Sequence, residues 1–141
     1  MRDQMSNIAP VQVLAPRAAR TDNTAIVGNI VDRLGFGSLT YLINIGANTD
    51  ADVTFTVLLE DGDAANMSDA APVADAQLIG TEELAAFAFD DDNQMRKLGY
   101  IGGKRYSRLT ITPAGNAGNI FVTCVAVMGH PHIAPTANPP A

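Results

Sequence analysis

A few groups of residues in this 141-residue chain have types and spacings that could support chemistry, and the acidic ones stand out first. Asp61 and Asp63 flank a glycine, and the run Asp90–Asp92 precedes Asn93. Carboxylate and amide oxygens can bind Ca²⁺, but neither spacing matches the twelve-residue EF-hand loop with its bidentate glutamate. Asp and Asn also favour turns, because their side chains accept hydrogen bonds from nearby backbone amides. We therefore interpret both groups as turns and expect neither a metal site nor a cofactor.

The single cysteine and the two histidines are equally poor candidates for catalysis. Zinc needs three or four ligands, whereas the chain offers Cys124, His130 and His132 without a CxxC or HExxH motif. Cys124 lies in an apolar segment, which predicts an inert core thiol, because a reactive thiolate needs an accessible, electropositive site. The glycines of residues 35–37 and 99–104 match neither phosphate-binding pattern. We therefore expect that the protein is not an enzyme.

Charge and composition exclude further classes. The net charge is −6, so the chain lacks the basic surface by which proteins bind nucleic acid. Its one basic group predicts a solvated strand face, with a protein contact as the alternative; the group comprises Arg96, Lys97, Lys104, Arg105 and Arg108. No apolar run approaches the roughly 20 residues of a membrane span, and the N-terminus shows no secretory segment. One cysteine indicates assembly in a reducing cytoplasm.

Alternation of apolar and polar residues predicts a series of strands. The segments are residues 24–31, 38–45, 52–60, 86–89, 94–101, 106–112 and 119–128. Residues 46–50 and the pair Gly102-Gly103 predict hairpin turns, and Gly28 is a candidate bulge. The last segment is apolar on both faces and predicts a central strand. Thr81 is the expected cap of one helical turn.

This pattern predicts an all-β, single-domain antiparallel β-sandwich over residues 23–128, and it leaves jelly-roll and immunoglobulin-like topologies open. Residues 1–22 and the proline-rich residues 129–141 are expected to form extended N- and C-terminal arms, because proline lacks an amide donor. Chain ends stay disordered unless something holds them. We therefore expect the arms to contact a neighbouring subunit or partner.

Five segments within residues 32–131 carry a resemblance to a known group of proteins. They are GFGSLT (35–40), DVTFTVLLEDGD (52–63), LGYIGGKRY (98–106), RLTITP (108–113) and GHP (129–131). In these segments the chain resembles small structural proteins encoded in the head-gene region of tailed bacteriophages and prophages. The resemblance implies a virion structural protein, most like a capsid decoration (cement) protein. Such a protein binds the outer surface of the phage capsid and stabilises contacts between major coat subunits.

The resemblance also implies partners and a location. The expected partners are the phage major capsid protein and further copies of the chain, with a homotrimer favoured. The protein would be made in the bacterial host cytoplasm and would end on the capsid exterior, where an acidic protein avoids repulsion by packaged DNA. We expect the two arms to make the contacts, through Ile8, Pro10, Val11, Val13, Pro131, Ile133 and Pro135. Deleting residues 1–14 should then weaken attachment without unfolding the domain.

Two other readings remain open. A head–tail connector or tail component would have similar β-rich sequence features, and copy number would separate it from a decoration protein. A host-surface carbohydrate-binding module belongs to another class, and such modules display aromatic platforms. The chain has no Trp, 3 Tyr and 5 Phe, which leaves Tyr100 and Tyr106 as the candidate surface aromatics.

Overall fold

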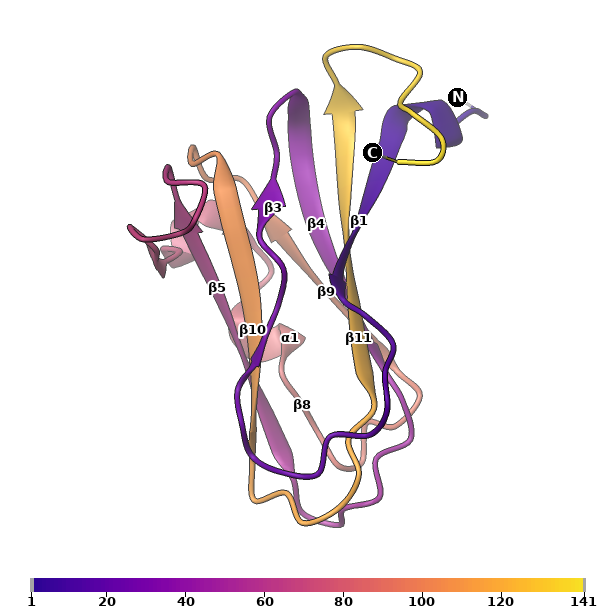
Figure 1. The fold of residues 1–141 in the computed structure, drawn as a ribbon, viewed down its shortest axis with the longest axis vertical. Coiled ribbons are helices and arrows are strands. Elements are labelled where there is room, and N and C mark those ends of the chain that lie inside the picture. The colour runs from indigo at the N-terminus through magenta and orange to yellow at the C-terminus, as the bar shows by residue number, and fades with distance from the viewer. Residues whose placement is uncertain (1, 141) are drawn as a thin grey trace.

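A computed structural model describes residues 2–140 as two antiparallel sheets packed face to face (Figure 1). The five-stranded sheet contains, in spatial order, β1 (Ile8–Leu14), β11 (Val122–Pro131), β4 (Phe36–Ile45), β9 (Met95–Tyr100) and β7 (Leu78–Ile79). The six-stranded sheet contains β2 (Ile26–Val27), β10 (Tyr106–Ala114), β5 (Thr54–Gly62) and β6 (Ala71–Pro72), with β3 (Val31–Asp32) on β10 and β8 (Phe87–Ala88) on β5. The helical elements are short: η1 (Met5–Asn7), η2 (Asp75–Gln77) and α1 (Glu82–Ala85). The predicted all-β sandwich is confirmed.

The order of the strands resolves the topology that the sequence leaves open. β2 and β3 are two pieces of one interrupted strand on β10, and β6 and β8 are two pieces of another on β5. With these pieces merged, successive strands alternate between the sheets except that β5 and the β6–β8 strand share one sheet, and the first strand, β1, lies beside the last, β11. That alternation is the order of a jelly roll, with β7 added at one edge.

The two predicted hairpins are wrong. β4 pairs with β11 and β9, whereas β5 pairs with β10, so residues 46–53 cross from one sheet to the other. Gly102-Gly103 likewise lies in a crossing, between β9 and β10. A strand that buries one face shows the same alternation whether the next strand lies beside it or opposite it. Sequence periodicity therefore identifies these strands but not their partners.

The prediction that residues 1–22 form an extended arm is wrong for Ile8–Leu14, which is an edge strand of the sandwich. β1 pairs with β11 along its length, and the side chains of Val13 and Leu14 are only 2% and 4% exposed. The C-terminal boundary also moves, because β11 continues to Pro131 instead of ending at residue 128. Residues 132–140 contain no strand.

Pro10 explains why β1 does not read as a strand from its sequence. The backbone carbonyls of Ile8 and Gln12 accept hydrogen bonds from Thr136 Oγ1 (2.6 Å) and Asn29 Nδ2 (3.1 Å), so they point away from β11. Pro10 shares their alternation and turns its missing donor toward the same open side, where no partner strand needs it. At this open edge, Pro10 therefore removes no hydrogen bond from the sheet.

The sandwich core forms where the inner faces of the two sheets meet. Tyr41 and Ser107 join the sheets through a buried hydrogen bond of 2.7 Å between Oη and Oγ. Phe55 and Phe87 stack with ring centroids 4.3 Å apart. Cys124 is fully buried, which raises the pKa of its thiol to about 12 and confirms the predicted core thiol. The chemistry expected of a nucleophile is thus unavailable at this residue.

Gly28 divides the strand predicted over residues 24–31 into β2 and β3. Its amide donates to Leu109 O at 2.8 Å, and a Cβ here would lie 2.6 Å from both Leu109 O and Val13 Cγ1. Only glycine fits this approach between β10 and β1. The sequence therefore predicts the position of the irregularity correctly, although the structure shows two separate strands there and not a bulge within one strand.

The expected helical turn is confirmed at α1. Thr81 Oγ1 accepts a hydrogen bond from Leu84 N at 3.1 Å, as an N-cap side chain does. No helix among residues 2–140 is long and apolar enough to cross a membrane.

Candidate functional site

The outer face of the five-stranded sheet, here called the apolar face, is the candidate site. Because side chains alternate along a strand, the residues between the buried ones point outward from the sandwich. They are Ile8, Pro10 and Gln12 of β1, Thr123, Val125 and Val127 of β11, Thr40, Leu42 and Asn44 of β4, Met95 and Lys97 of β9, and Ile79 of β7. Lys97 is the only charged residue among them.

Strand register brings the aliphatic members of the apolar face together at its centre. Val125 of β11 lies opposite Leu42 of β4, and Val127 lies opposite Thr40 two residues along. Val125 remains 37% exposed although it belongs to a strand with neighbours on both sides. Solvated sheet faces normally carry polar residues at such positions. An uncharged central face of this kind is typical of a surface that another protein covers.

A groove of about 580 Å³ extends the apolar face where β4, β9 and β7 approach α1. Four apolar side chains that are 58% to 71% exposed line it: Ile79, Leu84, Met95 and Ile101. Large apolar groups gathered in one place mark a contact site, whereas scattered ones need no explanation. The groove therefore belongs with the apolar face rather than with a separate site.

The outer face of the six-stranded sheet has different chemistry. Its outward positions carry threonines along β5 and β10: Thr54 and Thr56 are exposed, and Thr110 and Thr112 are half-buried. Ion pairs join Arg108 to Glu60 at 3.0 Å and Arg105 to Asp32 at 2.8 Å on the same side. This face also exposes Leu58 (36%) and Val27 (56%), so it differs from the apolar face in its ion pairs and hydroxyl groups and not in a lack of apolar side chains.

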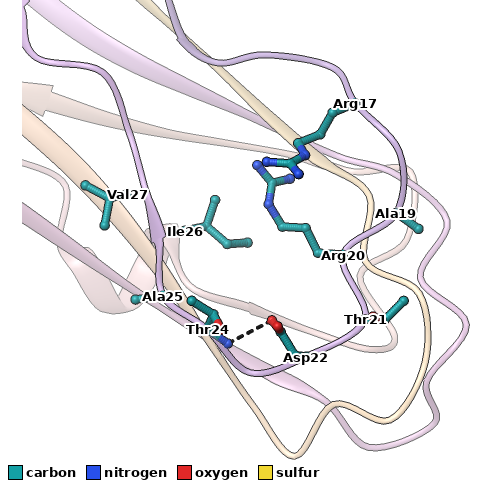
Figure 2. A pocket seen from close by; sticks show the side chains of 9 residues that line it. All are labelled: Arg17, Ala19, Arg20, Thr21, Asp22, Thr24, Ala25, Ile26 and Val27. Carbon is teal, nitrogen blue, oxygen red and sulfur yellow. Dashed lines mark hydrogen bonds between the residues drawn. The ribbon is translucent and has the colours of Figure 1, made fainter.

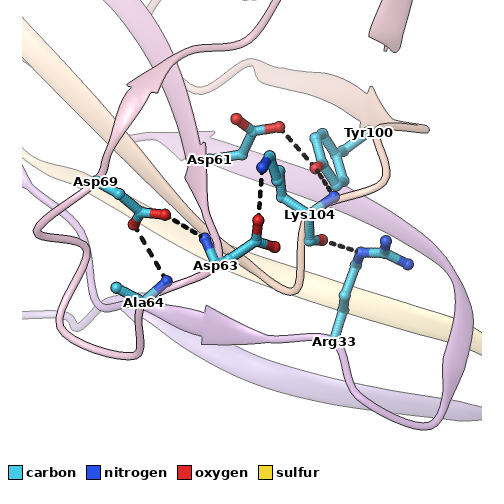
Figure 3. A network of polar contacts seen from close by, with 7 residues as sticks. All are labelled: Arg33, Asp61, Asp63, Ala64, Asp69, Tyr100 and Lys104. Carbon is cyan, nitrogen blue, oxygen red and sulfur yellow. Dashed lines mark hydrogen bonds and ion pairs between the residues drawn. The ribbon is translucent and has the colours of Figure 1, made fainter.

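A polar network closes one end of the sandwich and links the two sheets (Figure 3). Tyr100 Oη donates to Asp61 Oδ2 at 2.8 Å and accepts from Lys104 N at 3.1 Å. Arg33 Nε donates to Lys104 O, and Lys104 Nζ forms an ion pair with Asp63. Asp61 comes from β5 and Tyr100 from β9, so this bond spans the sheets. The carboxylates that resembled a cation site are used in structural contacts.

The pH dependence of stability tests this network. Burial, followed by the hydrogen bond to Asp61, raises the pKa of Tyr100 to about 12. In the unfolded chain a tyrosine ionises near pH 10, so the folded state holds its proton more tightly. The stabilisation is complete below about pH 10 and is lost as the pH rises toward about 12. We expect this effect to lower the free energy of unfolding, measured by urea titration at each pH, by on the order of 2 kcal/mol across this range.

The matched variants are Tyr100→Phe and Tyr106→Phe. The first removes the buried hydroxyl, so we expect lower stability at pH 8 and a flatter profile between about pH 10 and 12. The second changes a partly exposed residue of β10 and should keep the wild-type slope. An equally steep profile in Tyr100→Phe would show that the Tyr100–Asp61 bond is not the cause.

The structure places some of the predicted contact residues on the surface and others in the core. Ile8 and Pro10 lie on the apolar face, but Val11 turns inward and Val13 is buried, so Val13 is unavailable to a partner. On the C-terminal side Pro131 ends β11, Ile133 is 84% exposed and Pro135 is exposed. The bond from Thr136 Oγ1 to Ile8 O brings this segment next to the start of β1.

The acidic residues 90–93 form a turn whose carboxylates accept backbone hydrogen bonds, as the sequence predicts. Asp91 accepts from Ala88 N at 2.9 Å and pairs with Arg96 at 2.7 Å, and Asp92 accepts from Asn48 N at 2.9 Å. Bonding to backbone amides is the main cause that lowers the pKa of Asp91. Within residues 2–140, no three His, Cys, Asp or Glu residues are grouped as metal ligands would be.

Sequence reasoning missed the centre of the site: Leu42, Val125 and Val127. The available signal was that residues 119–128 are apolar on both faces. That pattern predicts a central strand. The prediction is confirmed, because β11 lies between β1 and β4. Only its inner face is buried in the core, and its other face is the apolar face.

The fold is that of a jelly-roll domain, and one outer sheet face carries a single charged residue, Lys97, and no carboxylate. No protein-family model matches the chain, and no curated protein matches it. Its fold is similar to that of PBSX exported protein XepA, with a TM-score of 0.54 and 15% sequence identity over 86% of this chain. The chain spans 37% of the XepA chain, and the likeness shows the fold alone.

Two more distant similarities carry no further argument. A structure of the infectious bursal disease virus Gx strain matches with a TM-score of 0.45 and 11% identity, over 91% of this chain and 35% of that chain. The SPBc2 prophage-derived protein YomS matches with a TM-score of 0.37 and 13% identity, over 86% of this chain and 93% of that chain.

Proposed function

We propose that this protein is a virion structural protein, specifically a capsid decoration protein that binds the outer surface of a phage capsid through its apolar face. Each bound copy would stabilise contacts between coat subunits, because a ligand that binds the assembled lattice better than free coat protein favours the lattice. The observation that carries the proposal is the outer face centred on Val125 and Val127, where Lys97 is the one charged residue, set against an ion-paired face on the opposite sheet.

Three features support this function. An acidic protein, net charge −6, can approach another protein surface most easily through a face without carboxylates. A rigid sheet loses little conformational entropy on binding. The segments that resemble phage head-region proteins include residues 35–40, of which 36–40 belong to β4, and residues 129–131 of β11; both flank one end of the apolar face.

Copy number in purified particles tests the proposal. Quantitative mass spectrometry of virions should give a number of copies similar to that of the major coat subunit, because a decoration protein covers the lattice. A handful of copies per particle would instead favour a head–tail connector or tail component. Absence from particles that carry the coat protein would overturn a role in the virion.

A further inference from the structure

Two arginines, Arg17 and Arg20, extend toward each other into a cavity of about 400 Å³ near the crossing from β1 to β2 (Figure 2). The cavity is lined by polar groups that include Thr21 and Thr24, and Ile26 closes it on the core side. Asp22 also lines it, but its Oδ1 accepts a hydrogen bond from Thr24 N at 3.1 Å. The two guanidinium groups therefore share a space without a carboxylate bridging them.

Among residues 2–140, neither arginine of the cavity forms an ion pair, which is also true of Arg2, Arg33 and Lys97. Asp and Glu outnumber Lys and Arg by 15 to 9. The ion pairs of this part of the chain join Arg96, Lys104, Arg105 and Arg108 to carboxylates. Burial, and then the nearby charge of Arg17, lowers the pKa of Arg20. The exposed Arg17 thus adds positive charge beside the half-buried Arg20, and a bound anion would offset the repulsion between them.

The segment that carries the arginines is fixed at two points. Arg20 N donates to Ile120 O at 3.2 Å, and Ile120 N donates to Arg20 O at 2.8 Å. Asn23 and Asn116 exchange two further bonds, from Asn116 N to Asn23 Oδ1 (2.8 Å) and from Asn23 Nδ2 to Asn116 O (3.2 Å). These contacts hold the backbone of the segment before any ligand arrives, which reduces the entropy lost on binding.

We propose that the Arg17–Arg20 pair is an oxyanion-binding site. Each guanidinium presents a planar fork of N–H donors that matches the oxygens of a phosphate or carboxylate. An anion between the two forks would accept from both and cancel their repulsion, and the hydroxyl groups of Thr21 and Thr24 offer further donors at the cavity wall. The ligand chemistry is a phosphate or carboxylate group, supplied either by a free anion or by an acidic side chain of a partner.

The test is an NMR titration of the free ¹⁵N-labelled protein, so it does not depend on the proposed role in the virion. Sodium phosphate and disodium glutarate are added separately, each against sodium chloride at the same ionic strength. We expect phosphate or glutarate to shift the arginine Nε–Hε resonances of Arg17 and Arg20 beyond the chloride control. A larger response to phosphate identifies a free phosphate-type ligand, and a larger response to glutarate identifies an acidic side chain.

Matched variants assign the response to the site. Arg17→Gln and Arg20→Gln should each weaken binding at least tenfold, whereas Arg2→Gln makes the same charge change elsewhere and should bind like the wild type. Arg20→Lys keeps the charge without the fork and should bind measurably more weakly than the wild type. Backbone amide spectra show whether each variant is folded. Shifts no larger than those with chloride, or equal affinity in a folded Arg17→Gln/Arg20→Gln double variant, would overturn the proposal.

Discussion

Val125→Lys should reduce capsid attachment by at least about tenfold while leaving the domain folded. Val125 lies at the centre of the apolar face and is 37% exposed, so a lysine there can reach solvent in the free protein. In a covered interface the same ammonium group would lose water without gaining a partner, and a loss of about 1.4 kcal/mol already corresponds to tenfold weaker binding. The measurement is sedimentation of the purified variant with capsids that lack the protein.

The control is Leu58→Lys, which introduces the same charge on the opposite face. Leu58 belongs to β5 and is 36% exposed, so the two substitutions are matched in residue type, strand context and exposure. We expect Leu58→Lys to attach like the wild type. Equal attachment of both variants would contradict docking through the apolar face, and equal loss in both would point to net charge as the cause.

Deleting residues 1–14 should unfold or strongly destabilise the protein, contrary to what the sequence alone predicts. The deletion removes the buried side chains of Val13 and Leu14 and leaves the edge of β11 unpaired. Burial of the two side chains contributes about 3–6 kcal/mol, a large part of a typical domain's stability of about 5–15 kcal/mol. Urea unfolding followed by circular dichroism would measure the loss.

A shorter deletion separates the strand from the residues before it. Residues 2–4 are exposed and precede both η1 and β1, so removing them should change the free energy of unfolding only slightly. A variant lacking residues 1–14 that unfolds at the wild-type urea concentration would show that β1 is dispensable. In that case the original expectation of a separate arm would be restored.

The long strands were predictable because each buries one face. Alternation in residues 38–45, 52–60 and 106–112 corresponds to β4, β5 and β10 within a few residues at each end. The pairing of these strands was not predictable, since a neighbouring strand in the same sheet and a strand in the opposite sheet impose the same period on the sequence. β1 was missed because Pro10 indicates an arm unless the open side of an edge strand is known in advance.

The candidate site was less predictable than the fold. Lys104 and Arg108 attracted attention as part of a basic group, yet both are paired with carboxylates that lie more than 40 positions away in the sequence. Arg17 and Arg20 fall in the segment that the sequence predicts as an extended arm, and only the folded chain shows that they converge. The apolar face depends on the register of separate strands, which no local pattern specifies.

The position of β11 between β1 and β4 has a consequence for how the protein is made. While the ribosome is still adding residues before Val122, β1 and β4 have been synthesised but lack the strand that joins them. Long-range pairing of this kind delays completion of the fold, because distant segments must meet. Val125 and Val127 also lie on β11, so a chain interrupted before that strand has neither a closed sheet nor the centre of the apolar face. Under the proposed function, only chains translated beyond this point would present the face that binds the capsid.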